Sequence, residues 1–197
     1  MKSYPFSALL SRMRYITRWG LMRAVRQENL AEHTAETAQL AHLLALLAQH
    51  RFGAQVEPQR VAVAALYHDA AEILTGDLPT PVKYSSELLK NAYKELERQA
   101  EERLTALAPP EIRRPLGRAV CGGDLNEREK KILKAADRLS ALIKCIEERQ
   151  SGNLEFASAE ATQRAALAAM ALPEADYFIE TMLPAYTRTL DELKAEE

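Results

Sequence analysis

The sequence predicts an all-α protein with a single domain. Aromatic residues make up only 6% of the chain, whereas Ala, Leu, Glu, Lys, Gln and Arg dominate it, and this composition favours helix over strand. Apolar residues recur at helical spacing along most of the chain, and two capping boxes, Asn29 to Glu32 and Asn126 to Glu129, mark the starts of long helices. At 197 residues the chain can bury one sizeable core but is short for two domains.

The composition also argues against several classes of function. A formal charge of −2 leaves no basic excess for binding a nucleic acid polymer along its backbone. Cys121 and Cys145 are too few and too far apart for a disulfide framework or a paired-cysteine metal site. No segment approaches the roughly 18 apolar residues of a membrane span, and Ser11-Arg12 interrupts the N-terminal apolar stretch before a secretory signal can form. We therefore expect a cytoplasmic protein with no membrane or nucleic acid partner.

The first third of the chain is predicted to form a helix, a loop and a long second helix. Four apolar side chains with the spacing of one helical face predict a first helix over residues 3–15: Phe6, Leu9, Leu10 and Met13. Residues 18–23 have no helical period and contain the only tryptophan, so we expect a loop there. The capping box at Asn29 opens a helix to about Arg51, and its body is apolar nearly all round, which indicates a central, buried helix.

Helical patterns continue towards the C-terminus. Pro58 suits the first position of a third helix, which we predict over residues 58–74, before a break at Gly76. Pro115 is expected to weaken one later helix, and Pro184 is expected to bend the last one. These later helices are predicted over residues 88–107, 111–120, 126–150, 154–172 and 174–193.

The third predicted helix contains ionisable residues next to an apolar run. His68 and Asp69 lie side by side after the apolar run of residues 61–66, and burying both is costly unless each finds a partner. Glu72, four residues after His68, is expected on the same helical face, and Asp77 on the following loop is expected to lie over the same end. A metal ion would satisfy such a group, so this stretch predicts a metal hydrolase site.

Two further residues are candidates to complete that site. His33 lies in the first turn of the second helix, although a lone histidine there is more often a satisfied polar group than a ligand. Asp137 is embedded in an apolar helical face, although a solvated aspartate at the edge of that face is an equal alternative. Two imidazoles and two carboxylates suit a borderline or hard divalent ion and leave room for water and a substrate oxygen. The lack of thiolates in this set argues against a structural zinc site.

The order of these residues resembles a known group of enzymes. His33, His68-Asp69 and Asp137, spread over successive helices, resemble the H…HD…D signature of the HD-domain metal-dependent phosphohydrolases. The similarity extends over nearly the whole chain and more narrowly resembles the bacterial 5′-deoxynucleotidases of the YfbR type. It is carried by the run HDAAEILTGDLPTPVKY from His68 to Tyr84, by Arg18-Trp19 and by Glu32-His33. That long run is very specific, whereas the scattered ligands alone are not.

The resemblance implies an HD-domain helical bundle that forms a homodimer and hydrolyses deoxyribonucleoside 5′-monophosphates to deoxynucleoside and phosphate. It implies one divalent cation, with Co, Mn, Zn, Cu, Ni and Fe as candidates, held by four ligands: His33, His68, Asp69 and Asp137. It further implies three catalytic residues: Glu72, Asp77 and Arg18. The substrate-binding residues that it implies are Arg18, Trp19, His33, Asp69, Asp77, Leu78, Pro79, Thr80 and Asp137.

Chemistry then suggests a role for each group outside the ligand set. The planar guanidinium of Arg18 suits bidentate contact with phosphate, and Glu72 is expected to orient the attacking water or accept its proton. Asp77 is expected either to steer the sugar or to protonate the leaving 5′ oxygen. We expect Trp19 to pack on the sugar and exclude a 2′-hydroxyl, although a core-filling tryptophan beside a surface arginine is the plainer alternative. Because Thr80 and backbone carbonyls can hold sugar and phosphate without reading the base, we expect broad base tolerance.

Two rival functions remain open from the sequence. The first is an HD hydrolase that acts on a deoxynucleoside triphosphate, a cyclic dinucleotide or an alarmone. These more highly charged substrates would be expected to require more local cations, and the stretch from His68 to Pro81 has no lysine or arginine. The second is a helical adaptor with a structural metal, in which loss of Glu72 would change nothing measurable.

Overall fold

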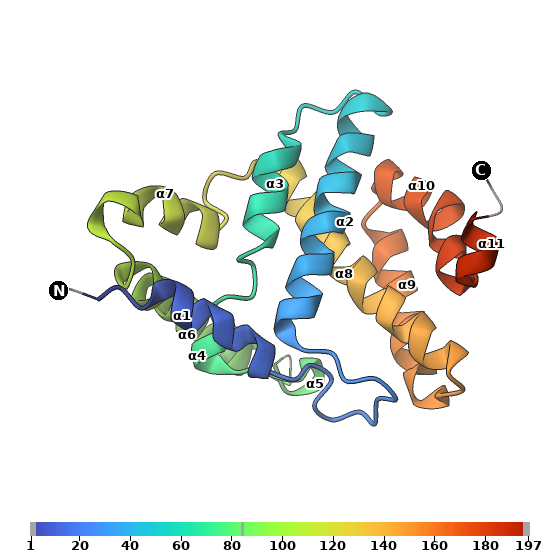
Figure 1. Ribbon diagram of the computed structural model, residues 1–197, viewed down its shortest axis with the longest axis horizontal. Coiled ribbons are helices and arrows are strands. Elements are labelled where there is room, and N and C mark those ends of the chain that lie inside the picture. The colour runs from blue at the N-terminus through green and yellow to red at the C-terminus, as the bar shows by residue number, and fades with distance from the viewer. Residues whose placement is uncertain (1–2, 84, 195–197) are drawn as a thin grey trace.

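The computed structural model describes residues 3–83 and 85–194, without the side chain of Thr80. Within these ranges the regular secondary structure is helical, apart from one isolated antiparallel bridge between Thr17 and Asn29 (Figure 1). The all-α prediction is therefore confirmed. None of the described helices is both long enough and apolar enough to cross a bilayer.

The described helices follow one another along the chain with mostly short connections, the exception being the long loop of residues 16–29, and three of them are 3₁₀ helices, labelled η. Their order is α1 (Phe6–Leu10), η1 (Ser11–Tyr15), α2 (Leu30–His50), α3 (Pro58–Ala65), α4 (Glu72–Thr75), α5 (Thr80–Lys83), α6 (Glu87–Ala106), α7 (Pro110–Val120), α8 (Glu127–Gln150), η2 (Leu154–Phe156), α9 (Ala157–Ala169), α10 (Pro173–Thr181), η3 (Leu183–Thr187) and α11 (Leu190–Lys194).

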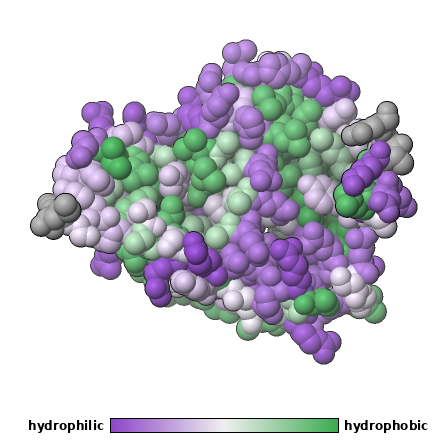
Figure 2. Space-filling view, viewed as in Figure 1, coloured by the Kyte–Doolittle hydropathy of each residue, from purple (hydrophilic) through white to green (hydrophobic). Residues whose placement is uncertain are grey.

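The main core lies where α2 packs between α3 and α8, while α9 packs on α8 and α10 on α2 (Figure 1). Leu44, Leu139 and Phe178 are fully buried there, and burial of each such side chain contributes about 1.5–3 kcal/mol. A smaller apolar cluster, which includes Phe6 and Leu104, joins α1 to α6 and α7. The outer surface is mixed, with polar groups over much of the face drawn in Figure 2 and apolar groups among them.

The two predicted capping boxes are confirmed and set where the two longest helices begin. The Asn29 side chain accepts hydrogen bonds from the amides of Ala31 and Glu32, and the Glu32 carboxylate accepts one from the Asn29 amide. Asn126 and Glu129 form the same reciprocal pair at the start of α8. The two helices then pack so that the first turn of α2, which carries His33, lies beside the middle of α8, which carries Asp137.

The prediction of one helix over residues 58–74 is wrong. The α-helix ends at Ala65, and residues 66–71 form tight turns before α4 begins. The Ala65 carbonyl accepts a hydrogen bond from His68 Nδ1 at 2.8 Å, and the backbone closes four-residue turns, as in the bond from the Ala70 amide to the Tyr67 carbonyl. His68 and Asp69 therefore lie on a turn rather than on a helical face.

Several other helix boundaries also differ from the prediction. The first helix becomes a 3₁₀ helix at Ser11, residues 154–156 form a 3₁₀ helix before α9, and the short helix α5 lies in the predicted loop. Pro184 lies in a separate 3₁₀ helix after α10 ends, because proline lacks the N–H that would continue an α-helix. Pro115 is accommodated inside α7.

A buried ion pair on α8 anchors the loop between η1 and α2. Lys144 Nζ donates to Glu148 and to the Arg26 carbonyl, both at 2.5 Å. The Glu148 carboxylate also accepts hydrogen bonds from the amides of Val25 and Arg26, at 2.7 and 3.0 Å. Burial alone would raise the pKa of Glu148, but Lys144 and these amide donors lower it to about 2.

Replacing Glu148 with alanine is expected to lower the free energy of unfolding by about 3–5 kcal/mol at pH 7, because Lys144 then stays buried without its partner. Since the folded pKa of Glu148 lies below its ordinary value of 4.5, its stabilisation is complete above that value and is lost as the pH falls towards 2. Urea unfolding at pH 7 and at pH 3 measures this, with Glu147→Ala as the neighbouring control. An equal loss at both pH values would contradict the assignment.

Candidate metal centre and substrate site

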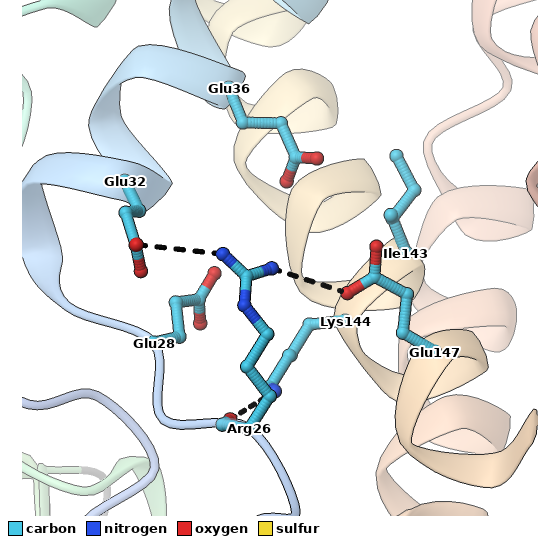
Figure 3. A pocket seen from close by; sticks show the side chains of 7 residues that line it. All are labelled: Arg26, Glu28, Glu32, Glu36, Ile143, Lys144 and Glu147. Atoms are coloured by element: carbon cyan, nitrogen blue, oxygen red, sulfur yellow. Dashed lines mark hydrogen bonds and ion pairs between the residues drawn. The ribbon is translucent and has the colours of Figure 1, made fainter. Parts of the chain in front are cut away.

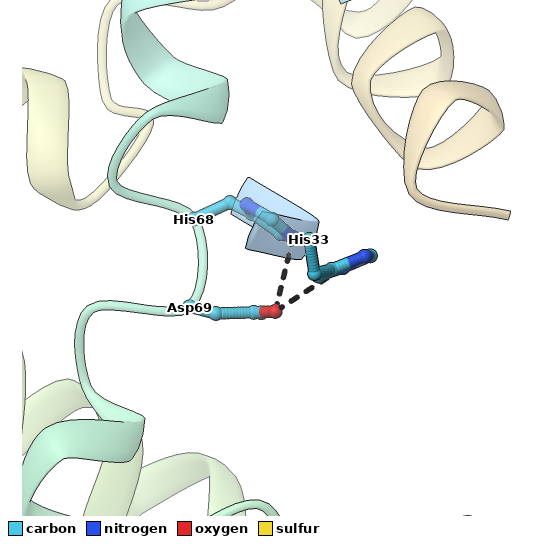
Figure 4. A group of neighbouring side chains, drawn as sticks. All are labelled: His33, His68 and Asp69. Atoms are coloured by element: carbon cyan, nitrogen blue, oxygen red, sulfur yellow. Dashed lines mark ion pairs between the residues drawn. The ribbon is translucent and has the colours of Figure 1, made fainter. Parts of the chain in front are cut away.

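Three segments of the chain bring two histidines and two aspartates together. His33 comes from α2, His68 and Asp69 come from the turn after α3, and Asp137 comes from α8. Asp69 Oδ2 lies 3.1 Å from His68 Nε2 and 3.5 Å from His33 Nε2. Figure 4 marks both contacts with dashed lines. Asp137 Oδ1 lies 3.3 Å from His33 Nε2, while its other oxygen accepts a hydrogen bond from Lys134.

The hydrogen bonds of both imidazoles leave the Nε2 lone pairs directed into this cluster. His68 Nδ1 must donate to the Ala65 carbonyl, which can only accept. The Ser140 hydroxyl donates to Glu36 at 2.5 Å, so its oxygen accepts the hydrogen bond from His33 Nδ1 at 2.9 Å. In each neutral ring the proton is therefore on Nδ1, the tautomer that a metal-binding Nε2 requires.

These buried nitrogens fit a metal ion well. Among the described residues, neither Nε2 atom has a hydrogen-bond partner, although each lies close to the Asp69 carboxylate. A lone pair that faces a carboxylate oxygen is unfavourable unless a cation or a proton lies between them. One ligand atom from each of His33, His68 and Asp69 lies within 4.8 Å of the other two. This mixed set of nitrogen and oxygen donors suits a borderline divalent ion.

The charges of the cluster also favour a cation. Burial alone would lower the pKa of His68, but the carboxylates of Asp69 and Asp137 raise it. Burial would raise the pKa of Asp69, yet His68 lowers it to about 2. The pKa of Asp137 is also far below its ordinary value, because its interactions with the His33 imidazole and with the charge of Lys134 outweigh burial.

Replacing Ser140 with alanine is expected to weaken metal binding by about 10- to 100-fold, because the hydrogen bond that orients the His33 ring is lost. Competition with a metal-sensitive chelator measures the change, and Ser158→Ala, on the exposed surface of α9, is a matched control. Unchanged affinity in Ser140→Ala would show that the hydroxyl does not hold the ring.

Arg18 and Trp19 lie in the loop that the sequence predicts, and both bind one glutamate. Arg18 Nε donates to Glu28 Oε2 at 3.2 Å, and its Nη1 lies 3.8 Å from Asp69 Oδ2, so the reading of Arg18 as a surface charge is wrong. Trp19 Nε1 donates to the same Glu28 oxygen at 2.7 Å, and its ring packs on the buried Phe156 with a centroid distance of 5.2 Å. Burial would lower the pKa of Arg18, but the charges of Glu28 and Asp69 raise it.

Two further carboxyl groups lie near Asp69. Burial, reinforced by the charges of Asp69 and Asp77, raises the pKa of Glu72 to about 9. Burial also raises the pKa of Asp77, which interacts with Arg18 and Asp69. Glu72 therefore lies near the cluster, as predicted, but for a different reason. It does not share a helical face with His68 and Asp69, and it is instead the first residue of α4, directly after the turn that carries them.

The loop after α4 is held by α6. The Tyr93 hydroxyl donates to the Gly76 carbonyl at 2.9 Å, next to Asp77. Leu78 and Pro79 follow as half-buried residues, and the side chain of Thr80 lies outside what the structure describes. Glu28, Ser140 and Tyr93 were not identified from the sequence. Ser140 and Tyr93 contact partners that are distant along the chain, whereas the contact of Glu28 with Arg18 depends on the loop conformation.

The helix arrangement and the H…HD…D cluster together define the class as the HD-domain phosphohydrolase fold. The fold is similar to that of an HD-domain phosphohydrolase from Listeria innocua, with a TM-score of 0.80 and 23% identity over 96% of this chain and 91% of that one. It is also similar to the cyanophage S-2L HD phosphohydrolase DatZ bound to dA and one catalytic Zn²⁺ ion, with a TM-score of 0.66 and 19% identity over 90% and 96% of the two chains. These likenesses establish the fold.

Sequence comparison identifies the family within that class. Residues 5–186 match the family model described as 5′-deoxynucleotidase YfbR-like. The chain is 43% identical to the 5′-deoxynucleotidase YfbR of Shigella dysenteriae over 98% of its length and 97% of that protein. It is also 43% identical to the 5′-deoxynucleotidase VV1113 of Vibrio vulnificus over 98% and 100% of the two chains. The chain belongs to the 5′-deoxynucleotidase YfbR-like family, and the resemblance seen in its motifs is confirmed.

Proposed function

We propose that this protein is a metal-dependent 5′-deoxynucleotidase that converts deoxyribonucleoside 5′-monophosphates to deoxynucleoside and phosphate. The observation that supports it most directly is the pair of buried Nε2 lone pairs facing Asp69, with the Arg18 guanidinium beside that carboxylate. The names of the relatives supply the substrate class. Selectivity for 2′-deoxyribose and little preference among bases are part of the proposal.

His33, His68, Asp69 and Asp137 would hold the metal ion, with Co, Mn, Zn, Cu, Ni or Fe as candidates. When bound, such an ion supplies a Lewis acid that polarises the phosphate and lowers the pKa of water. The four side chains supply the geometry, since the bonds of Nδ1 to Ser140 and to the Ala65 carbonyl fix both rings.

Arg18 would bind the phosphate of the substrate. Its Nε atom is occupied by Glu28, so its two terminal nitrogens remain for the phosphate oxygens, and Nη1 already lies towards Asp69. A guanidinium in a partly dry site stabilises the charge that spreads over the transferring phosphoryl group.

Glu72 and Asp77 would move the protons of the reaction. Burial raises the pKa of the Glu72 carboxyl to about 9, and a group with such a raised pKa can donate or accept a proton during hydrolysis. Asp77, which is half-buried beside Arg18, would steer the sugar or protonate the 5′ oxygen. Trp19, Leu78, Pro79 and Thr80 would contact the sugar, without a charged group to read the base.

Phosphate release tests this function. The chelated protein is supplied with Mn, Co, Zn or Mg in turn and offered each deoxy and ribo 5′-monophosphate, a deoxynucleoside triphosphate and a cyclic dinucleotide. We expect turnover of the deoxy monophosphates with any of the four bases. Chromatography of the same mixtures detects triphosphate released from the deoxynucleoside triphosphate or a linear dinucleotide formed from the cyclic one, because these hydrolyses yield no free phosphate. Either product without turnover of the monophosphates would establish a rival HD activity, and no turnover of any substrate would favour the adaptor.

We also propose that the protein acts as a homodimer in the cytoplasm. The family resemblance supports the dimer, and light scattering after gel filtration is expected to give twice the 22.0 kDa of one chain. A monomer at micromolar concentration would contradict it.

A further inference from the structure

We infer that Glu28 is a positioning residue that sets the selectivity for deoxyribose by fixing the Arg18 guanidinium and the Trp19 indole relative to each other. This inference rests on the proposed function. Glu28 is not among the residues that the sequence motifs identify as ligands, catalytic residues or substrate contacts.

The two hydrogen bonds end on the same oxygen atom. Glu28 Oε2 accepts from Arg18 Nε at 3.2 Å and from Trp19 Nε1 at 2.7 Å. Since the guanidinium extends from this oxygen to within 3.8 Å of Asp69 Oδ2, Glu28 links the indole to the metal cluster through one rigid planar group. The distance between the phosphate-binding group and the sugar-contacting ring is therefore set by one carboxylate.

Glu28 also closes the loop that carries both side chains. Its carbonyl accepts a hydrogen bond from the Arg18 amide at 3.0 Å, beside the bridge between Thr17 and Asn29. Within that loop Trp19 has a φ of 61°, a left-handed conformation that is strained for a bulky residue. The bond from its indole to Glu28 and its packing on Phe156 hold Trp19 in this conformation.

The surroundings of Glu28 make it a suitable position for substitution. It lines a polar cavity of about 160 Å³ with three other glutamates, in which Arg26 reaches between Glu32 and Glu147 (Figure 3). Water can fill the space that a shortened side chain leaves in such a cavity, so we expect Glu28→Ala to fold. Glu147 lines the same cavity from α8 and pairs with Arg26, and within the part of the chain that the structure describes it forms no hydrogen bond or ion pair with Arg18 or Trp19.

Three variants separate positioning from charge. Glu28→Ala removes both hydrogen bonds, Glu28→Gln keeps an oxygen that can accept both but loses the charge, and Glu147→Ala is the control from the same cavity. For Glu28→Ala we expect kcat/KM on a deoxyribonucleoside 5′-monophosphate to fall by about 10- to 100-fold, and the preference over the matching ribonucleotide to fall by about tenfold. Glu28→Gln is expected to retain most of the preference.

Fluorescence gives a second measurement that needs no substrate. Trp19 is the only tryptophan, so the emission reports on the surroundings of this one indole, which include Glu28 and Phe156. We expect a red shift and stronger acrylamide quenching in Glu28→Ala, and the wild-type spectrum in Glu147→Ala. Glu28→Met, which keeps the length of the side chain without accepting either bond, replaces Glu28→Ala if that variant does not fold.

The outcomes separate this inference from the proposed function. If the wild type hydrolyses deoxyribonucleotides but Glu28→Ala keeps both the sugar preference and the Trp19 emission, the inference is wrong and the proposed function stands. If the wild type releases no phosphate from any nucleotide, the proposed function is wrong and the selectivity role of Glu28 fails with it. A changed emission with an unchanged preference would also overturn the selectivity role.

Discussion

Replacing Glu72 with glutamine is expected to lower kcat by about 10²- to 10⁴-fold while the protein still binds its metal ion. Glutamine has nearly the same shape but cannot hold and release a proton, and the buried position of Glu72 leaves little room for another residue to take over. Single-turnover phosphate release, with the bound metal counted in the same sample, measures the two effects separately.

Glu101→Gln provides the control for this substitution, because Glu101 is also partly buried with a raised pKa but lies on α6 beside Cys121. Its turnover is expected to match that of the wild type. If Glu72→Gln were as active as the control, Glu72 would not be a proton-transfer residue, and the adaptor with a structural metal would regain support.

Replacing Asp69 with asparagine is expected to weaken metal binding by more than about 100-fold and to abolish measurable turnover. Asp69 Oδ2 is the atom towards which both imidazole nitrogens and the Arg18 guanidinium converge, and a neutral amide removes the charge that makes it a strong ligand. Isothermal titration of the chelated protein with Mn²⁺ or Zn²⁺ measures the affinity directly.

Asp124→Asn is a matched control for that variant, because Asp124 is an exposed partner of Arg118. It is expected to keep wild-type affinity for the metal. Tight metal binding in Asp69→Asn, with the stoichiometry unchanged, would remove Asp69 from the ligand set.

The parts of the fold that could be predicted are those with local signals. The capping boxes at Asn29 and Asn126 fix where α2 and α8 begin, and those two starts place His33 and Asp137 in the same region. The end of α3 could not be predicted, because it depends on His68 Nδ1 binding the Ala65 carbonyl, an interaction that hydrophobic periodicity does not report.

The site residues that could be predicted carry a local sequence signal, whereas the residues that were missed do not. His68 and Asp69 were recognisable because polar residues after an apolar run need partners. Ser140 was not, because it touches His33 from 107 positions away along the chain. Glu28 lies only ten positions from Arg18, but their contact depends on a loop conformation with a left-handed Trp19, which composition does not reveal.

The most direct test of the central claim is the titration of the chelated protein with one divalent metal while bound ions and phosphate release are measured together. If two imidazoles and two aspartates hold a single catalytic ion, turnover will rise in proportion to the bound metal and reach its maximum at one ion per chain. Full turnover by protein that contains no ion, or a maximum that requires two ions per chain, would contradict it.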